Sequence, residues 1–367
     1  MINSKKLLNF LEKKDVKFYT GVPDSVLKNF TNLLSQKNSH ILASNEGSAV
    51  SIGIGYYLAN KKMPCIYMQN SGLANAINPL VSIAHKGVYS IPLLLIIGWR
   101  GSPGFKDEPQ HLIKGKITKN LLKLLGIRFA VIQRDRDFNK ISKLINYSKT
   151  KKIPVACLIK NNTIFPVSKK NKKKNFISKD SILRIDVLRE VLKNIKSKTK
   201  LISTTGYTSR ELYQLRKEEK FKKGKDFYMI GGMGHSSSVA FGVSTNKSNQ
   251  VVCLDGDGSM LMHLGSLHTI GNMNKNNFKH ILINNQSHES VGGQKINFIR
   301  TNLEKITKGL GYSKYLKVRN KKDLKRSISY MMRYKGTIFL EILVKKGSIK
   351  NLGRPKNFIK IKENFLR

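Results

Sequence analysis

Short runs of apolar and β-branched residues alternate with helix-like patterns along the whole chain, and this alternation constrains the fold more than any other feature. In such a pattern each run is a buried strand, and the helix after it returns the chain to the same edge of a parallel sheet. The runs fall in two groups: Ile41–Ala43, Cys65–Met68, Leu93–Ile97, Phe129–Ile132 and Val155–Ile159, then Leu201–Ser203, Phe227–Ile230, Val251–Leu254, His280–Ile283, Tyr315–Val318 and Ile338–Val344. We therefore expect an α/β protein with two successive parallel-sheet domains.

A basic segment separates the two groups of runs. From Lys169 to Lys174, Asn171 is the only uncharged residue, and the segment follows Pro166 and shows no periodicity, which is typical of a linker. The 367 residues, 40% of them hydrophobic, suffice for two domains of ordinary size with a core in each. We predict a first domain over residues 1–168, a linker over 169–179 and a second domain over 180–367.

The charge balance is strongly basic, with 68 Lys and Arg against 22 Asp and Glu, a net charge of +46. Such a field attracts polyanions, so a nucleic-acid-binding protein is the alternative from another functional class. However, the lysines are spread from Lys5 to Lys362 and no nucleic-acid-binding motif accompanies them, which favours a solvated lysine surface. A basic surface would also steer small anionic substrates toward the protein.

The cysteines and the apolar runs indicate the compartment. Cys65, Cys157 and Cys253 each lie in an apolar run, and three cysteines cannot all pair within one chain. Reduced thiols in the cytoplasm therefore fit better than disulfides. The longest apolar stretch, Ile91–Ile97, is far shorter than the roughly 20 residues that cross a bilayer, and the first residues predict a helix and not a signal peptide. We expect no membrane association.

The sharpest local signal is Gly256-Asp257-Gly258-Ser259 after one apolar run, with Asn284-Asn285 at the end of the next. Because neighbouring parallel strands end at the same edge of a sheet, Asp257 and Asn285 can supply oxygen ligands to one magnesium ion. The glycines let the backbone approach a phosphate, and a helix that starts at Ser259 would present its amides to an anion. Asp and Gly also form ordinary turns, so the spacing carries the argument for a metal-bridged diphosphate.

This motif and its spacing resemble the diphosphate-binding motif of thiamine-diphosphate enzymes. The resemblance implies thiamine diphosphate and Mg²⁺ as cofactors, and it implies Asp257, the Asn285 side chain and the Ser287 carbonyl as magnesium ligands. In this family a second glycine turn, which matches residues 231–236, lines the cofactor, and Met233 aligns with the residue that props the cofactor in its bent form. The physical alternative for Met233 is that it fills core space. The implied cofactor-binding residues are Gly232, Met233, Gly234, His235, Gly256, Asp257, Gly258, Ser259, Asn285 and Ser287.

The same family requires a glutamate that contacts the aminopyrimidine ring of the cofactor from the other kind of domain. Glu46 follows the run Ile41–Ala43 and opens an apolar helical pattern, which matches that placement. Its alternative is a carboxylate that only stabilises the start of a helix. The glutamate domain precedes the Gly-Asp-Gly domain, which is the order of the decarboxylase branch, and the chain has no room for the middle domain of most decarboxylases.

Three longer stretches, at residues 21–25, 67–72 and 98–111, resemble the phosphonopyruvate decarboxylases, with the sulfopyruvate decarboxylases as nearest relatives. The resemblance implies a small anionic 2-oxo acid as substrate, and 3-phosphonopyruvate in particular, converted to phosphonoacetaldehyde and CO₂ in phosphonate biosynthesis. Sulfopyruvate is the alternative substrate. A phosphonate carries nearly two negative charges at neutral pH, whereas a sulfonate carries one. Sulfopyruvate enzymes are often split into two subunits, so a single fused chain favours phosphonopyruvate.

The resemblance also implies roles for residues in the first domain. Asp24 and His111 lie in segments that the family places at the active site, so they are the candidates for proton transfer. Arg100 and Lys106 follow the run Leu93–Ile97, where cations suit a phosphonate group. Either cation could instead pair with Asp107 or Glu108. The loop between Arg100 and Lys106 contains Pro103 and Gly104, which is consistent with a lid that excludes water.

The second domain holds further candidates. Arg210 is either a substrate-binding or a structural residue, in a segment where Thr208 and Glu211 predict a capping box at the start of a helix. Many decarboxylases carry a catalytic glutamate where this chain has Val291, and Glu289 lies two residues early, so its role stays open. The family places the cofactor between two subunits, which implies a homodimer or a dimer of dimers.

Overall fold

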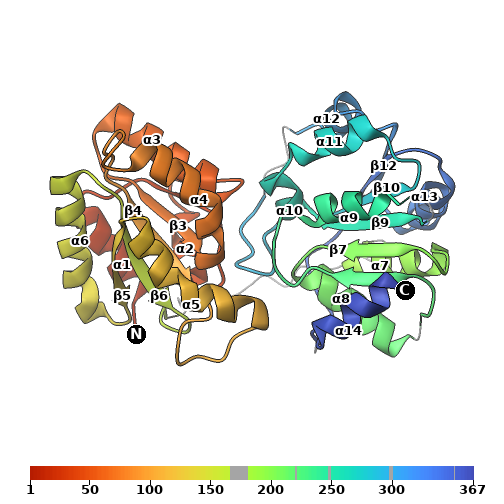
Figure 1. Ribbon diagram of the computed structural model, residues 1–367, viewed down its shortest axis with the longest axis horizontal. Coiled ribbons are helices and arrows are strands. Elements are labelled where there is room, and N and C mark those ends of the chain that lie inside the picture. The colour runs from red at the N-terminus through yellow and green to blue at the C-terminus, as the bar shows by residue number, and fades with distance from the viewer. Residues whose placement is uncertain (166–180, 220, 247–248, 297–300, 351) are drawn as a thin grey trace. The chain divides into compact units, whose positions relative to one another are not determined.

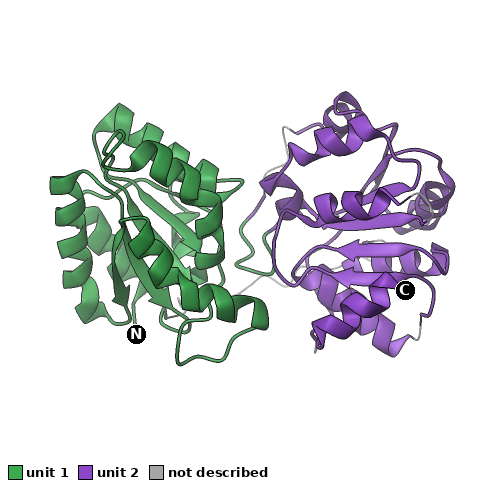
Figure 2. Ribbon diagram, in the orientation of Figure 1, with its two compact units in different colours: residues 1–173, 288–294 green, residues 174–287, 295–367 purple. Residues whose placement is uncertain are grey.

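The computed structural model of the protein describes residues 1–165, 181–219, 221–246, 249–296, 301–350 and 352–367 (Figure 1). The chain forms two compact units, which we call unit 1 (1–173 and 288–294) and unit 2 (174–287 and 295–367) (Figure 2). Each unit contains one six-stranded sheet in which all neighbouring strands are parallel. The predicted α/β class with two parallel sheets is confirmed, while the predicted linker at 169–179 lies outside the described residues.

Unit 1 is a sheet with helices on both faces. Its strands are β1 (Tyr19–Gly21), β2 (His40–Leu42), β3 (Cys65–Gln69), β4 (Leu94–Trp99), β5 (Arg128–Ile132) and β6 (Val155–Lys160), in the order β2-β1-β3-β4-β6-β5. Its helices are α1 (Ser4–Lys13), α2 (Lys28–Leu34), α3 (Glu46–Asn60), α4 (Leu73–Pro79), α5 (Pro109–Leu124) and α6 (Phe138–Lys151), with short helical segments at Asn70–Gly72, Leu80–Ala84 and Asp135–Asp137. One core lies between the sheet and α1, α2 and α6, and the other between the sheet and α3, α4 and α5.

Unit 2 has the same layered construction. Its strands are β7 (Lys200–Ser203), β8 (Lys225–Tyr228), β9 (Val251–Gly256), β10 (Phe278–Asn284), β11 (Lys314–Val318) and β12 (Ile338–Leu343), in the order β11-β12-β10-β9-β7-β8. Its helices are α7 (Arg184–Asn194), α8 (Tyr207–Glu218), α9 (Ser236–Ser244), α10 (Asp257–Met262), α11 (Ser266–Met273), α12 (Leu303–Gly309), α13 (Lys321–Arg333) and α14 (Phe358–Leu366). One core contains α7, α8 and α13, and the other contains residues of α9 to α12 and of α14.

The strand predictions are confirmed apart from one omission. Each predicted run contains a strand whose bounds agree within two residues, whereas β1 is a strand that the pattern missed. All three residues of β1 are buried, but the sequence Tyr-Thr-Gly is too short and too polar to stand out as an apolar run. Cys65, Cys157 and Cys253 lie in β3, β6 and β9, where they are buried and unpaired. Within the described ranges, no helix has the length and apolar character that would let it cross a bilayer.

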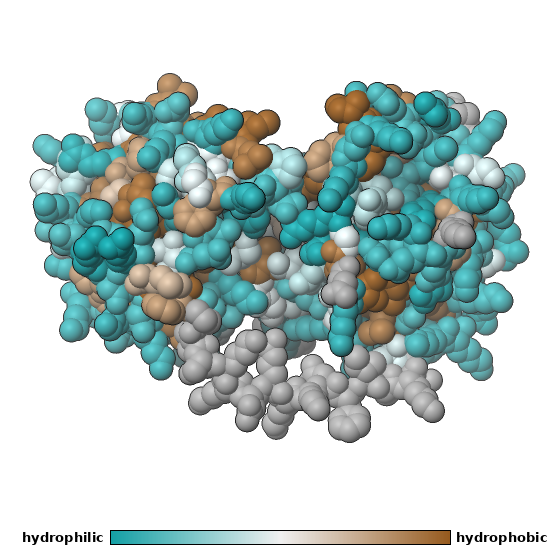
Figure 3. Space-filling view, turned by 90° about the horizontal axis from the view of Figure 1, so that it is seen from below, coloured by the Kyte–Doolittle hydropathy of each residue, from teal (hydrophilic) through white to brown (hydrophobic). Residues whose placement is uncertain are grey.

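The visible surface of both units is mostly hydrophilic, with small hydrophobic areas between the polar residues (Figure 3). Lys279 on β10 is an exception to the solvated lysine surface, since it is only 1% exposed. Its ammonium group donates hydrogen bonds to the carbonyl oxygens of Asn276 (2.8 Å), Tyr334 (2.8 Å) and Gly336 (3.0 Å). Burial lowers the pKa of Lys279 to about 8. This lysine therefore ties the start of β10 to the segment between α13 and β12 inside unit 2.

Candidate active site

The Gly-Asp-Gly turn lies at the carboxyl end of β9, beside the end of β10, where Ile283 pairs with Gly256. Helix α10 begins at Asp257, so the predicted start at Ser259 is wrong. Gly256 still has extended backbone, and the Asp257 carboxylate accepts the N–H of Gly258 at 2.8 Å in the first turn. The helix dipole stabilises a carboxylate at that position, which explains why the helix starts two residues before the predicted start at Ser259.

The three predicted magnesium ligands lie together at this edge of unit 2. The backbone N–H of Ser287 donates to Asp257 Oδ2 (3.3 Å) and to Asn285 Oδ1 (3.0 Å), so both side-chain oxygens are close to it. Asp257 is 4% exposed, and burial raises the pKa of its carboxyl to about 6. The Ser287 hydroxyl is also buried, with no hydrogen-bond partner within the described ranges. These oxygens fit a hard cation, which would offset the cost of the buried charge.

The two adjacent asparagines have different environments. Asn284 is 2% exposed and donates to Glu341 Oε1 on β12 at 2.8 Å, while its own oxygen accepts the N–H of Gln286 at 3.1 Å. Its side chain thus holds the ends of β10 and β12 together. Asn285 is the carboxamide that shares the Ser287 N–H with Asp257.

Ser259 connects three segments that the sequence presents separately. Its hydroxyl accepts hydrogen bonds from the Thr204 hydroxyl (3.0 Å) and from the backbone N–H of Gly234 (3.1 Å). Thr204 follows β7, Gly234 lies in the glycine loop after β8, and Ser259 lies in α10. The sequence predicts no role for Thr204, because a threonine at a strand end carries no distinctive spacing.

The loop at residues 231–235 needs its glycines for conformation and for space. Gly232 and Gly234 have φ angles of +64° and +93°, and a Cβ at Gly234 would lie 2.5 Å from the ring of His263. The exposed ring of His235 stacks on His263, with 4.4 Å between the ring centroids. Met233 is partly buried. A compact loop of this kind can approach a ligand closely with its backbone.

Glu46 lies at the carboxyl edge of the sheet in unit 1, as the first residue of α3. The preceding Asn45 caps the helix by accepting the N–H of Ser48 at 2.8 Å, so Glu46 does not serve as the cap. Glu46 is 5% exposed, and its Oε2 accepts a hydrogen bond from Asn75 at 2.9 Å. Gly72 packs directly against the carboxylate, since a Cβ there would lie 2.1 Å from Oε1. The carboxylate is therefore held in one place by α4 and the segment before it.

Asp24 is completely buried at the same edge of unit 1. Its Oδ1 accepts a hydrogen bond from the Gln69 side chain (2.8 Å), and its Oδ2 accepts the N–H groups of Val26 (3.0 Å) and Leu27 (3.2 Å). Burial raises the pKa of the carboxyl, although these hydrogen bonds and the Arg100 charge act in the opposite direction. Asp24 therefore holds a proton more readily than an exposed aspartate, which suits a proton donor.

Arg100 is paired with Asp107, the alternative that the sequence left open. Its Nε donates to Asp107 Oδ2 at 2.8 Å, its Nη2 contacts Oδ1 at 2.5 Å, and its Nη1 donates to the Ser25 hydroxyl at 2.9 Å. The two side chains are 17% and 3% exposed. The pair and the hydrogen bonds that Asp107 accepts hold the pKa of Asp107 well below its usual range, despite the opposing effect of burial. Arg100 is thus an oriented guanidinium whose charge is largely compensated.

Lys106 and His111 flank the same loop. Lys106 is exposed and makes no hydrogen bond or ion pair with the residues that the structure describes. His111 lies in the first turn of α5, and its Nδ1 is buried without a hydrogen-bond partner within those residues. Burial and the nearby Arg100 charge lower the pKa of His111 to about 4, so its ring is neutral at pH 7.

The environment of Arg210 supports the structural alternative. Its Nη2 donates to the Leu352 carbonyl at 2.9 Å, and its Nε lies 3.4 Å from the Gly353 carbonyl. The predicted capping box is wrong: α8 begins at Tyr207, and the N-cap is Gly206 at φ +91°. The Glu211 carboxylate instead lies in the interior, where its Oε1 is 3.3 Å from Arg184 Nη1 and accepts the N–H of Ile349, also at 3.3 Å.

Residues 288–294, which contain Glu289 and Val291, belong to unit 1. The N–H groups of Val291 and Gly292 donate to the His288 carbonyl, which closes a tight turn. The Gln294 side chain donates to the Thr31 hydroxyl (2.9 Å) and to Asn32 Oδ1 (3.1 Å) on α2. Glu289 and Val291 both lie in this turn.

A cavity of about 350 Å³ in unit 1 contains none of the candidate residues. It lies at the amino ends of β5 and β6, where its lining includes Gly126, Ile153 and Pro154. Ligands of parallel sheets bind at the opposite edge, so we do not assign this cavity to the active site.

Two family models match the chain. The model described as thiamine pyrophosphate enzyme, N-terminal TPP binding domain, matches residues 3–121, and that described as the C-terminal TPP binding domain matches residues 204–342. Each match contains one of the two candidate clusters: Glu46 and Asp24 in the first, and Asp257 and Asn285 in the second.

Curated relatives match over most of the chain. A phosphonopyruvate decarboxylase of Streptomyces viridochromogenes is 31% identical over 97% of this chain and 92% of its own length. A sulfopyruvate decarboxylase of Methanosarcina acetivorans is 24% identical over 94% of this chain and 91% of its own length. The sulfopyruvate decarboxylase subunit beta of Methanocaldococcus jannaschii is 42% identical over 35% of this chain and 66% of its own length.

Proposed function

This chain belongs to the thiamine pyrophosphate enzymes, among the 2-oxo acid decarboxylases, and from that premise we propose that it converts 3-phosphonopyruvate to phosphonoacetaldehyde and CO₂. The observation that carries the proposal is the cluster of Asp257, Asn285 and Ser287, a buried oxygen site at the edge of a parallel sheet. The similarity to a phosphonopyruvate decarboxylase over 97% of the chain supports the substrate.

Thiamine diphosphate is the cofactor of this family, and the residues of unit 2 fit its diphosphate through a magnesium ion. Asp257, the Asn285 side chain and the Ser287 carbonyl would hold the cation. Gly256, Gly258 and Ser259, together with the loop Gly232–His235, would contact the cofactor. When bound, the cofactor supplies the electron sink that decarboxylation of a 2-oxo acid requires.

The residues of unit 1 would supply the protons. Glu46, fixed by Asn75 and Gly72, would hydrogen-bond the ring nitrogen of the cofactor. Asp24, whose carboxyl has a raised pKa, is suited to give a proton to the product. His111 has a neutral ring and a buried Nδ1 without a hydrogen-bond partner among the described residues, so we propose that it relays a proton through its two ring nitrogens; a pKa of about 4 makes it a weak base that does not store the proton.

The substrate phosphonate would meet the cations after β4. Arg100 is oriented by Asp107 and Ser25, which fixes the direction of its guanidinium. Lys106 makes no hydrogen bond or ion pair within the described ranges, so no carboxylate compensates its charge, and its ammonium group can bind a dianion. Arg210 contributes less to this proposal, because its guanidinium already contacts two carbonyl groups of its own unit.

Replacing Lys106 by Met is expected to raise the KM for 3-phosphonopyruvate by about tenfold, the effect of roughly 1.4 kcal/mol, with little change in kcat. Steady-state kinetics measures both constants. Lys116→Met is the matched control, since Lys116 is an exposed lysine on the adjacent α5 and should leave KM unchanged. Equal KM values for the two variants would remove Lys106 from the substrate site.

Replacing Gly72 by Ala is expected to lower kcat at least tenfold, because the new Cβ would displace the Glu46 carboxylate, and a misplacement of about 1 Å can cost about 100-fold. The control is Gly55→Ala in α3, where a Cβ would meet nothing within 4 Å. We expect wild-type kcat for that control. Wild-type kcat for Gly72→Ala would show that the Glu46 position is not critical.

The assembly and the compartment are further parts of the proposal. We propose a homodimer or a dimer of dimers, with each cofactor bound between two subunits, as in this family. Sedimentation velocity with and without cofactor and Mg²⁺ tests it, and an active monomer would contradict it. We also place the enzyme in the cytoplasm, which the three buried, unpaired cysteines support.

The deciding experiment compares CO₂ release from 3-phosphonopyruvate, sulfopyruvate and pyruvate with thiamine diphosphate and Mg²⁺. We expect kcat/KM to be highest for 3-phosphonopyruvate. A preference for sulfopyruvate would keep the chemistry and change the substrate, an outcome that the 42% identity to a sulfopyruvate decarboxylase subunit makes worth testing. No turnover with any of the three, combined with salt-dependent DNA binding, would favour the nucleic-acid alternative that the +46 charge suggests.

A further inference from the structure

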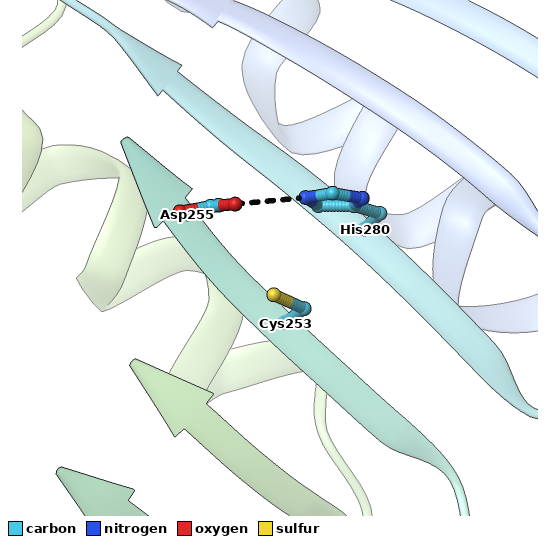
Figure 4. Close-up of side chains that lie close together, drawn as sticks. All are labelled: Cys253, Asp255 and His280. Carbon is cyan, nitrogen blue, oxygen red and sulfur yellow. Dashed lines mark ion pairs between the residues drawn. The ribbon is translucent and has the colours of Figure 1, made fainter. Parts of the chain in front are cut away.

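A buried cluster of ionisable side chains lies next to the Gly-Asp-Gly turn (Figure 4). Cys253 and Asp255 occupy alternate positions of β9 and so point to the same face of the sheet, and His280 on β10 is paired with Cys253. All three residues are at most 1% exposed. None of them has a role in the mechanism proposed above.

One oxygen of Asp255 joins the two cofactor-binding motifs of unit 2. Oδ1 accepts hydrogen bonds from the Ser236 hydroxyl (2.9 Å) and from the backbone N–H of Gly256 (2.9 Å). Ser236 is the first residue of α9 and directly follows the loop Gly232–His235, while Gly256 directly precedes Asp257. The loop and the turn are therefore held to the same atom.

The other oxygen of Asp255 faces His280, as the dashed line in Figure 4 shows. His280 Nε2 lies 3.4 Å from Oδ2 and has no hydrogen-bond partner of good geometry within the described ranges, while Nδ1 is 2.9 Å from the Tyr312 hydroxyl. The rings of Tyr312 and Phe339 pack around the imidazole. His280 thus lies beside the second oxygen of Asp255, on a neighbouring strand.

The same three side chains could in principle bind a metal ion, since one ligand atom from each lies within 4.8 Å of the others. The hydrogen bonds of the cluster involve other atoms than Asp255 Oδ2 and His280 Nε2, which face each other, and they point to a different role for Asp255. Asp255 Oδ1 already accepts two hydrogen bonds, and His280 Nδ1 is engaged by Tyr312. Burial also raises the pKa of the Cys253 thiol well above its usual value, so the thiol is protonated in the metal-free protein.

We propose that Asp255 is a positioning residue for the cofactor: its carboxylate holds the Gly232–His235 loop and the Gly-Asp-Gly turn in the arrangement that binds thiamine diphosphate. The inference rests on the proposed function. A buried acceptor that satisfies two buried donors is costly to remove, because both donors lose their partner at once. Here the two donors belong to the two segments that must contact the same ligand.

Calorimetric titration of thiamine diphosphate into the full-length protein with excess Mg²⁺ tests the proposal. Asp255→Ala is expected to weaken binding by about tenfold or more, since losing a buried acceptor costs about 1–3 kcal/mol. Asp255→Asn keeps an acceptor at the Oδ1 position and should give a smaller loss. At saturating cofactor, the KM for substrate should stay at the wild-type value in both variants, because the contacts of Asp255 described above all lie within unit 2, whereas the proposed substrate-binding residues Arg100 and Lys106 belong to unit 1.

Cys253→Ala is the matched control, since it removes a buried group from the same strand and cluster without touching the Gly256 N–H. It should lower the unfolding temperature and leave the dissociation constant within about twofold of wild type. If wild-type protein binds cofactor and Asp255→Ala binds it equally well, the inference is wrong while the proposed function stands. Stoichiometric metal in the purified protein that is lost in Asp255→Ala would also overturn it. If wild-type protein binds no thiamine diphosphate, the proposed function itself fails.

Discussion

Replacing Glu46 by Gln is expected to lower kcat for decarboxylation by about 100-fold or more, the range in which a positioned proton-transfer group contributes. Gln keeps the size of the side chain and can still bond to Asn75, but it cannot protonate a ring nitrogen. Because we propose that unit 2 holds the diphosphate, the affinity for thiamine diphosphate should change little. Single-turnover kinetics and calorimetric titration measure the two quantities separately.

The control for this variant is Glu12→Gln, which removes a carboxylate from α1 that pairs with Lys37 and has 31% side-chain exposure. Wild-type kcat is expected for it. A Glu46→Gln enzyme that retains wild-type kcat would leave Glu46 as a structural carboxylate at the start of α3 and would remove the main link between unit 1 and the cofactor chemistry.

Replacing Asp257 by Asn is expected to have two opposite effects. Binding of thiamine diphosphate in the presence of Mg²⁺ should weaken by at least about 100-fold, because loss of an outer-shell partner alone costs about 10- to 100-fold in metal affinity and Asp257 is proposed as a direct ligand. Without cofactor, the variant should be at least as stable as wild type at pH 7, since burial disfavours the charged carboxylate that it removes.

Thermal unfolding of the cofactor-free proteins and calorimetric titration with Mg²⁺ check these two effects. Asp323→Asn on α13, whose side chain is 42% exposed, is the control in the same unit and should change neither binding nor the cofactor-free stability beyond its weak surface contacts. A variant Asp257→Asn that is less stable without cofactor and binds it normally would identify Asp257 as a structural residue.

The sequence predicted the architecture well because buried parallel strands are apolar runs with helices between them, and that pattern is visible without any tertiary information. It could not predict β1, whose three residues are buried by their neighbours and not marked by their own composition. The start of α10 was also placed wrongly, since the deciding factor is the hydrogen bond from Gly258 to the Asp257 side chain.

The candidate site also contains residues that the sequence predicts and residues that it does not. Residues that form a spaced motif, such as Asp257 with Asn285, could be selected from the sequence. Their supporting partners could not, because Asn75, Thr204 and Ser236 are ordinary polar residues whose importance comes from what lies across from them in space. The pairing of Arg100 with Asp107 was an open alternative, and only coordinates could decide it.

Chemical labelling of the buried Lys279 can report when unit 2 opens. Burial lowers the pKa of this amine to about 8, so it is largely unprotonated in mildly alkaline buffer, where a surface lysine stays charged. At 1% exposure it is nevertheless shielded from acylating reagents while β10 stays packed. Labelling of Lys279, followed by mass spectrometry against a background of rapidly modified surface lysines, would therefore measure how often unit 2 opens, and the rate should fall when a ligand stabilises that unit.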